Sequence, residues 1–330
     1  MPVLLRSLRR PRRVVFALAV ALLLGGCSAL VSIDLTPRIK PLEEETVEGS
    51  GLNKILLLDL SGLLQEDTPT LSLTTPAPHV PLLARVREEL RKASEDNKVR
   101  ALVVRINSPG GTITASDVLY KEIREFRQQR KVPVVAAIMD VGASGGYYAA
   151  LAADQILVHP TTITGSIGVI MVTLNAQGLL EKIGVAPLAI KSGPLKDAGS
   201  PFRGLTDEER GVFQGVIDDM YGRFVRLVAE SRNIPEARVR AFADGRIYTA
   251  EQARGLGLVD RVGYLDEAIE MAKQAAGLTE ARVVMYHRPR EYRANMYSAA
   301  PVTPGADALL GQLAGALGGP GTRFLYLWWP

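Results

Sequence analysis

The segment DVGASGGYYAALAADQIL, Asp140–Leu157, places a serine in a turn that carries three glycines. Ser144 lies between Gly142 and the pair Gly145–Gly146, after one apolar run and before an alanine-rich one. A tight turn needs one or two glycines, because glycine adopts positive φ at little cost. The additional glycine indicates that the backbone approaches another group closely, beside a hydroxyl.

A second glycine-rich turn, NSPGG at 107–111, follows a buried strand that we expect at 99–106. The turn at Ser144 follows a strand expected at 132–139, and a helical pattern at 113–130 connects the two strands. A right-handed crossover makes such strands parallel and brings both turns to one edge of the sheet. Backbone N–H groups of two glycine turns can stabilise a tetrahedral oxyanion, which makes Ser144 a candidate nucleophile.

Strand and helix patterns alternate along the body of the chain. Further apolar runs predict strands, amphipathic patterns predict helices, and a capping box at 206–209 opens one long helix; these elements are expected at 54–60, 80–97, 155–158, 169–173 and 206–232. This alternation favours an α/β fold with a largely parallel core sheet.

The candidate nucleophile needs a base, and residue chemistry leaves three candidates open. Histidine is the usual base, and His159 follows the serine turn closely, although Pro160 comes directly after it. A lysine can serve where desolvation lowers its pKa toward neutrality. Lys191 and Lys196, both in IKSGPLKD (190–197), are candidates on this ground.

The first 26 residues are typical of a secretory signal. Five arginines within the first 13 residues precede an apolar run at 14–24, which is too short for a comfortable membrane span. The stretch LGGC at 24–27 resembles the bacterial lipobox. We therefore expect a lipoprotein, lipidated at Cys27 and attached to a membrane of the bacterial cell envelope, with its catalytic domain outside the cytoplasm. An uncleaved N-terminal anchor is the alternative.

Composition excludes several classes of function. Without the arginine-rich head the chain has 35 acidic and 34 basic residues, so no nucleic-acid surface is expected. Cys27 is the only cysteine, which excludes a disulfide framework and a thiol nucleophile in the folded body. The three histidines are scattered along the chain, so we expect no metal site, and we expect no other cofactor.

Residues 54–265 resemble the signal peptide peptidase A family, in its short, single-repeat type. Five stretches carry the resemblance, in the family's order: INSPGG (106–111), ASGGYYAA (143–150), HPTTITGSIGV (159–169), IKSGPLKD (190–197) and DGRIYTAEQA (244–253). The resemblance implies a fold similar to that of Clp protease and crotonases, built from repeated ββα units. It also implies a Ser/Lys dyad in place of a catalytic triad.

The family's functional residues are carried over by motif. Ser144 matches the nucleophile, Lys196 the general base, and Ser166 the serine that orients the lysine. Gly111 and Gly145 match the oxyanion donors. In single-repeat members the serine and the lysine are thought to meet across a subunit interface, which implies a homo-oligomeric ring. The resemblance implies a serine endopeptidase that hydrolyses apolar peptides, such as cleaved signal peptides.

These interpretations divide the chain into a signal peptide at 1–26, a stalk at 27–50, a peptidase domain at 51–280 and a C-terminal tail at 281–330. Two other functions stay open. A crotonase-like acyl-CoA enzyme predicts acidic catalytic residues and no export signal, and a lipoprotein scaffold of the same fold predicts that Ser144 is dispensable.

Substrate binding is expected near the glycine turns. Extended peptides would pair with a strand near Gly111, over an apolar floor formed by Ile167, Val169, Ile170 and Met171. The aromatic end of the tail, FLYLWWP at 324–330, has three possible roles: contact with membrane, occupation of a neighbour's groove, or simple aggregation.

Overall fold

A computed structural model of the chain describes residues 40–66, 80–289, 294–298 and 323–328. The predicted signal peptide and Cys27 lie outside the described residues. None of the helices in these four ranges combines the length and the apolar character that crossing a bilayer requires.

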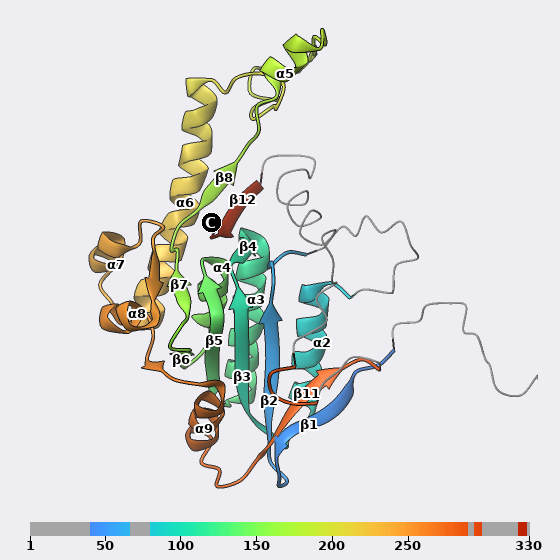
Figure 1. Ribbon diagram of the computed structural model, residues 1–330, viewed down its shortest axis with the longest axis vertical. Helices are drawn as coiled ribbons and strands as arrows, with labels where there is room; N and C mark the ends of the chain where they lie inside the picture. Colours follow the sequence, from blue (N-terminus) through green and yellow to red (C-terminus); the bar gives the residue numbers. More distant parts are fainter. Residues whose placement is uncertain (1–39, 67–79, 290–293, 299–322, 329–330) are drawn as a thin grey trace, which may run out of the picture. The chain divides into compact units, whose positions relative to one another are not determined.

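In the described part of the chain, the centre of the fold is a nine-stranded sheet (Figure 1). Its strands are β1 (Glu43–Gly49), β2 (Lys54–Ser61), β3 (Val99–Ser108), β5 (Val134–Ala143), β6 (Gln155–Val158), β7 (Ile163–Gly165), β9 (Ile247–Thr249), β10 (Arg261–Val262) and β11 (Arg282–His287). The main order is β1-β11-β2-β3-β5-β6-β10, and every pair from β11 to β10 is parallel. The predicted α/β fold with a largely parallel core sheet is confirmed.

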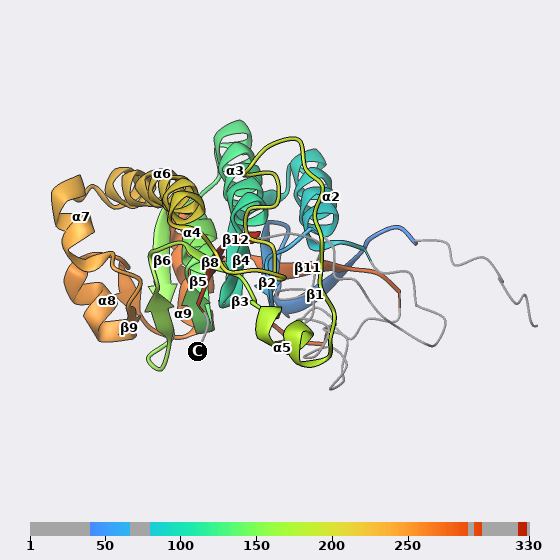
Figure 2. The same cartoon turned by 90° about the horizontal axis from the view of Figure 1, so that it is seen from above.

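Helices cover both faces of this sheet (Figures 1 and 2). The alternation of side chains along β2 separates two cores. Leu56 and Leu58 belong to a core with residues of α2 (Leu82–Glu95), α3 (Ile113–Arg130), α4 (Gly145–Ala150) and α6 (Asp207–Arg232). Ile55 and Leu57 face α9 (Leu265–Ala275) on the other side. Three shorter helices are α5 (Gln177–Lys182), α7 (Glu236–Phe242) and α8 (Ala250–Leu256).

The elements predicted from periodicity agree closely with the structure. The helix expected at 113–130 has the same bounds as α3, and the capping box at the start of α6 is formed. There the N–H of Glu209 donates to Thr206 Oγ1 at 3.2 Å, and the N–H of Thr206 donates to Glu209 Oε2 at 3.0 Å. Strand β5 runs on to Ala143, so Ser144 follows the strand directly.

Two segments assigned above to stalk and tail contribute strands. β1, within 27–50, pairs antiparallel with β11, within 281–330, and β11 continues the parallel order beside β2. The charged residues of β1 are tolerated because it is an edge strand with mostly exposed side chains. Arg323–Leu327, β12, joins β4 (Gly110–Thr112) and β8 (Ile170–Val172) in a second sheet.

A buried ion pair links β2 to β3. Arg105 and Asp59 approach to 2.7 Å, and their side chains are 5% and 1% exposed. Arg105 also donates to the carbonyl of Ser298 at 2.7 Å and to that of Met296, so it ties residues 294–298 to the sheet. The Arg105 guanidinium thus pairs with the buried Asp59 carboxylate and also donates to two backbone carbonyls far along the chain.

Replacing Arg105 should therefore destabilise the fold. We expect Arg105→Met to lower the free energy of unfolding by about 3 kcal/mol, because it removes one partner of a buried ion pair. Urea unfolding followed by circular dichroism measures the change. Arg87, 75% exposed and paired with Glu122, is the matched control, and Arg87→Met should cost less than about 1 kcal/mol. Equal losses in the two variants would contradict this account.

Candidate active site

Ser144 occupies the junction between strand β5 and helix α4, at φ +51° and ψ −115°. This region of backbone space is strained for a residue with a β-carbon. Two hydrogen bonds hold it there: Ser144 N–H donates to the Gly165 carbonyl at 2.8 Å, and Tyr148 N–H donates to the Ser144 carbonyl at 2.8 Å. The strain persists because the surrounding backbone fixes the turn.

The Ser144 hydroxyl is buried without a partner. The residue is 1% exposed, and Oγ has no hydrogen-bond partner among the described residues. Leaving a hydroxyl in this state costs about 1–3 kcal/mol, and such groups are rare in native proteins. The strained backbone and the unpartnered oxygen together make Ser144 a candidate functional residue.

The two glycine turns lie against each other, as the parallel arrangement predicts. Ser108 of β3 is in register with Gly142 of β5. A β-carbon on Gly110 would lie 2.7 Å from the Gly145 nitrogen, and one on Gly145 would lie 2.3 Å from Ser116 Oγ. Only glycine permits these approaches. The backbone of both turns therefore reaches the neighbourhood of Ser144, while the roles of Gly111 and Gly145 as oxyanion donors stay predictions.

Ser166 lies beside Ser144 through strand pairing. Ala143 of β5 is in register with Gly165 of β7, so the two serines are the next residues on paired strands. Ser166 also has positive φ, +48°, and its N–H donates to the Arg246 carbonyl at 2.8 Å. The structure thus brings Ser166 to the nucleophile, whereas its function in orienting a lysine stays a prediction.

The threonines of HPTTITG have a role that the sequence did not reveal. Thr164 Oγ1 donates to the Gly142 carbonyl at 2.6 Å, and Thr162 Oγ1 donates to the Ile138 carbonyl at 3.1 Å. Both side chains are buried. They fasten the loop and β7 to β5, and so fix the carbonyl of Gly165 that positions Ser144.

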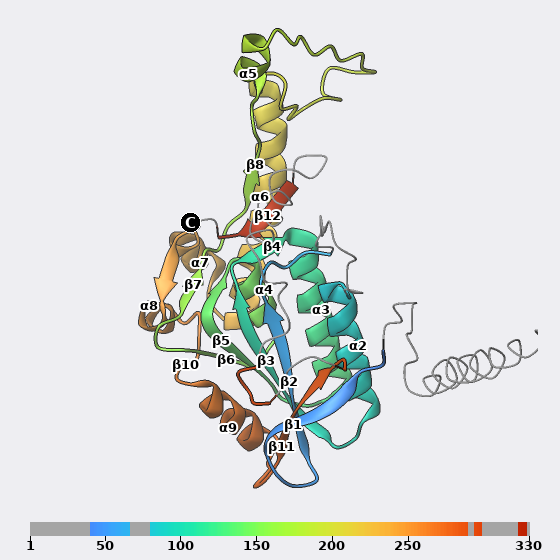
Figure 3. The same cartoon turned by 45° about the vertical axis from the view of Figure 1, so that its right-hand side comes forward.

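Lys196 is not brought to Ser144 within the protomer. It lies in the segment 173–206 between β8 and α6, which extends together with α5 beyond the end of the sheet that carries Ser144 (Figures 1 and 3). Its side chain is exposed and makes no hydrogen bond or ion pair with any residue in the four described ranges. The candidate nucleophile and the candidate base are thus separate in a single copy.

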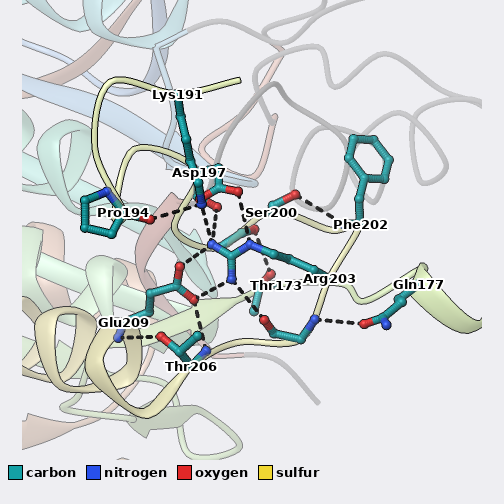
Figure 4. Close-up of polar contacts among 12 residues, drawn as sticks. Thr173, Gln177, Lys191, Pro194, Asp197, Ser200, Phe202, Arg203, Thr206 and Glu209 are labelled. Carbon is teal, nitrogen blue, oxygen red and sulfur yellow. Dashed lines mark hydrogen bonds and ion pairs between the residues drawn. The ribbon is translucent and has the colours of Figure 1, made fainter. Parts of the chain in front are cut away.

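Lys191, the alternative base, is held in an ion-pair network (Figure 4). Its ammonium lies 2.5 Å from Asp197 Oδ1 and 3.2 Å from the Pro194 carbonyl. Arg203 donates to both Asp197 and Glu209, which joins this loop to the start of α6. Lys191 is thus ion-paired with Asp197, and the choice between Lys191 and Lys196 as the base stays a prediction.

The same network fixes the charges around Lys196. Hydrogen bonds from Arg203 and then Lys191 hold the pKa of the Asp197 carboxyl well below its usual range. Hydrogen bonds from Arg203 and the Thr206 backbone lower the pKa of Glu209 to about 2. Both carboxylates are therefore charged at neutral pH, and the loop that carries Lys196 stays anchored.

His159, the third candidate base, contacts Thr161 and Tyr264. Its Nδ1 lies 2.9 Å from Thr161 Oγ1, and its ring meets that of Tyr264 edge-on at 5.0 Å. These contacts indicate a structural role at the end of β6. In the ranges that the structure describes, no group of three or more His, Cys, Asp or Glu side chains could hold a metal ion.

Comparisons with known proteins place the sequence among peptidases. The model of peptidase family S49 matches residues 126–279. A relative from Synechocystis sp., to which protease activity is ascribed, is 46% identical over 192 residues, covering 58% of this chain and 69% of the relative. A relative from Enterococcus faecium, to which signal peptide peptidase activity is ascribed, is 39% identical over 246 residues, covering 74% and 70%. The chain belongs to the signal peptide peptidase A family.

As a member of this family the chain is a serine peptidase, which is the first of the functions expected from sequence. Ser144 is buried and has positive φ at the edge of the sheet, and its role as the nucleophile of this activity stays a prediction. Among solved structures, a point mutant of ClpP1 from Listeria monocytogenes aligns with a TM-score of 0.42 and 17% identity, covering 64% of this chain and 94% of that one.

Backbone strain at Ser144 gives a test that needs no substrate. We expect Ser144→Gly to be more stable than Ser144→Ala by about 1 kcal/mol, because only glycine relieves the positive φ. Chemical unfolding of both variants measures the difference.

Ser116 in α3 is the matched control, since its side chain is also buried and its backbone is helical. Here the order should reverse, with Ser116→Gly less stable than Ser116→Ala by roughly 0.5–1 kcal/mol. The same order at both positions would show that Ser144 is not strained.

Proposed function

We propose that this serine peptidase is a membrane-associated endopeptidase of the bacterial cell envelope that cleaves apolar peptides, such as spent signal peptides, outside the cytoplasm. It uses a Ser144/Lys196 dyad that forms between neighbouring copies of a homo-oligomeric ring. The observation that carries this proposal is the buried Ser144 Oγ, which has no partner among the described residues although the turn holds it in a strained position.

The exposed surface around Lys196 supports assembly. Apolar side chains along the same segment are exposed, up to 97% for Ile190, and they include Leu174, Leu179, Ile183, Val185, Leu188 and Phe202. Apolar surface of this kind usually marks an interaction site. A second copy that covers it would desolvate the lysine and deliver its amine to a neighbour's Ser144.

The mechanism follows from the dyad. The uncharged amine of Lys196, oriented by Ser166, takes the proton from Ser144 Oγ, which attacks the peptide carbonyl carbon. The N–H groups of Gly111 and Gly145 stabilise the oxyanion, and the lysine returns the proton to the leaving amine. Water, deprotonated by the same lysine, then hydrolyses the acyl-enzyme.

The side chains in and around β8 support apolar substrates. Ile170 is exposed and Val169 and Met171 are half-buried, as a binding floor requires, whereas Ile167 is buried in the core and does not belong to this floor. Beside it, a cavity of about 490 Å³ is lined by Ser166, by apolar residues such as Ile217, and by the acidic residues Asp218 and Asp244. The apolar part of this lining supports a hydrophobic substrate.

Attachment to the membrane rests on the sequence alone. The basic head, the apolar run at 14–24 and the cysteine at its end support lipidation of Cys27. A lipid at this position would place the peptidase at the surface where cleaved signal peptides accumulate.

The inter-copy dyad is testable by mixing two inactive variants. Ser144→Ala and Lys196→Ala should each reduce hydrolysis of an apolar peptide by about 10³-fold. Refolded together in equal amounts, they should recover about one quarter of the wild-type activity, because one interface in four then joins an intact serine to an intact lysine. A fluorogenic peptide assay measures both effects.

Lys191→Ala is the control, since its ammonium is already ion-paired, and it should keep most of the activity. If the mixture stays inactive while both variants fold and assemble, the dyad does not form between copies. If Lys196→Ala alone retains normal turnover, another base acts.

Lipidation of Cys27 should change both the mass of the chain and its partition between the detergent and aqueous phases. Expressed in a bacterial host, the wild-type chain should lose residues 1–26, gain the mass of a lipid on Cys27 and partition into detergent. Cys27→Ser should remain in the aqueous phase or keep its signal segment. An unchanged mass and partition in the variant would contradict lipid attachment. If the chain is secreted without a lipid, the wild-type protein and the Cys27→Ser variant would both be released.

A further inference from the structure

The NSPGG turn is hydrogen-bonded to the segment that follows strand β2. The N–H of Gly62 donates to the Asn107 carbonyl at 3.0 Å, and the N–H of Leu64 donates to the Gly110 carbonyl at 2.9 Å. The Leu64 carbonyl in turn accepts from the N–H of Thr112 at 2.8 Å. These backbone bonds fix the segment to the turn from the end of β3 to the start of α3.

The side chain of Ser108, the last residue of β3, adds two bonds at the same place. Its Oγ donates to the Gly62 carbonyl at 2.6 Å and accepts from the Gly110 N–H at 3.1 Å. A hydroxyl can donate its single proton and accept at the same time, so the two bonds are compatible. The residue is fully buried. Ser108 thus connects Gly110 to the segment after β2 at a position that solvent does not reach.

Ser108 also contacts the second glycine turn. It is in register with Gly142 on β5. A β-carbon on Gly146 would lie 2.6 Å from the Ser108 carbonyl oxygen and 3.4 Å from the Ser108 β-carbon. The start of α4 therefore packs against Ser108, and a shift of this residue would change the spacing of the two turns beside Ser144.

The direction of the candidate oxyanion donor is set at Gly110. The Gly111 N–H and the Gly110 carbonyl belong to one peptide group, which is planar and trans, so they point in opposite directions. Because the Leu64 N–H holds that carbonyl, the Gly111 N–H points away from Leu64. Gly110 has φ +102° and no β-carbon to restrict its rotation. The bond from its N–H to Ser108 therefore restrains the rotation that would turn the donor.

We propose that Ser108 is a positioning residue of the oxyanion site, whose hydroxyl fixes Gly110 and through it the direction of the Gly111 N–H. This inference rests on the proposed function, because it takes Gly111 as a donor in the reaction of Ser144. Ser108 acts through Gly110 and is not itself a catalytic residue. Negative charge on the substrate oxygen develops only in the transition state, so a misdirected donor slows the chemical step and changes substrate binding little.

Ser108→Ala removes both hydrogen bonds and tests the proposal by steady-state kinetics. With a fluorogenic apolar peptide, we expect kcat to fall about 10- to 100-fold while KM changes less than about twofold. A thermal melt shows whether the variant is folded. An unchanged kcat in the folded variant, or a loss carried by KM alone, would overturn the proposal.

Ser108→Cys separates hydrogen bonding from packing. A thiol fills nearly the same space as the hydroxyl but is a weak donor and a weak acceptor. We expect kcat to fall at least fivefold, again with little change in KM, and this variant decides the matter if Ser108→Ala does not fold. Full activity in Ser108→Cys would show that position 108 only fills space, which would overturn the proposal.

Ser298 is the matched control. It is also buried, and its Oγ accepts from the N–H of Asn295 at 3.2 Å, so Ser298→Ala likewise removes a hydroxyl that holds nearby backbone. We expect kcat and KM to stay within about twofold of the wild type. An equal fall of kcat in Ser298→Ala and Ser108→Ala would show that general destabilisation lowers the rate, and it would overturn the proposal.

A fluorescently labelled peptide aldehyde probes the oxyanion site without turnover. Ser144 Oγ bonds to the aldehyde carbon, its proton passes to the base, and the carbonyl π electrons move to the oxygen, which becomes the oxyanion. Measured by anisotropy, affinity for the aldehyde should fall about 10- to 100-fold in Ser108→Ala. Affinity for the corresponding peptide alcohol, which cannot form this adduct, should be unchanged. Equal aldehyde affinity in the wild type and the folded variant would overturn the proposal.

The two assays distinguish this inference from the proposed function. Peptide hydrolysis by the wild type, with kcat and aldehyde affinity unchanged in Ser108→Ala, would support the function and overturn the inference. A wild type that hydrolyses no peptide, but whose affinity for the aldehyde depends on Ser108, would contradict the function and support the inference.

Discussion

The site depends on how closely two backbone turns approach at one end of a parallel sheet. Gly110 and Gly145 come so near that a β-carbon on the first would lie 2.7 Å from the nitrogen of the second. Parallel pairing of β3 with β5 sets this approach, and glycine alone permits it. Ser144 joins β5 to α4 with positive φ. The candidate nucleophile is thus placed by backbone geometry.

A single copy carries this geometry but leaves it chemically incomplete. The hydroxyl of Ser144 has no partner among the described residues, and the exposed amine of Lys196 lies on a segment beyond the sheet. Ion pairs join Asp197 to Lys191 and Arg203 within that segment. On the proposed mechanism, such ordering of the loop would lower the entropic cost of bringing its lysine to a neighbour.

Local sequence patterns predicted most of the helices and strands. Elements that form by pairing with distant residues were not predicted. The bounds of α3 and the capping box at Thr206 follow from side chains within a few residues of one another. By contrast, β1 pairs with β11 across more than two hundred residues, so the highly charged β1 was not recognisable as a strand from its own composition. At the site, motifs predicted Ser144 and its neighbours. They did not indicate that Gly165 and the buried threonines hold the turn at Ser144 in place.

The separation of the two proposed dyad residues has a consequence for control of the enzyme. Ser144 is buried at the edge of the sheet, whereas Lys196 is exposed on the segment between β8 and α6. On the proposed mechanism, an unassembled chain would therefore lack a base at its nucleophile. Assembly would add the base and so couple proteolysis to formation of the ring.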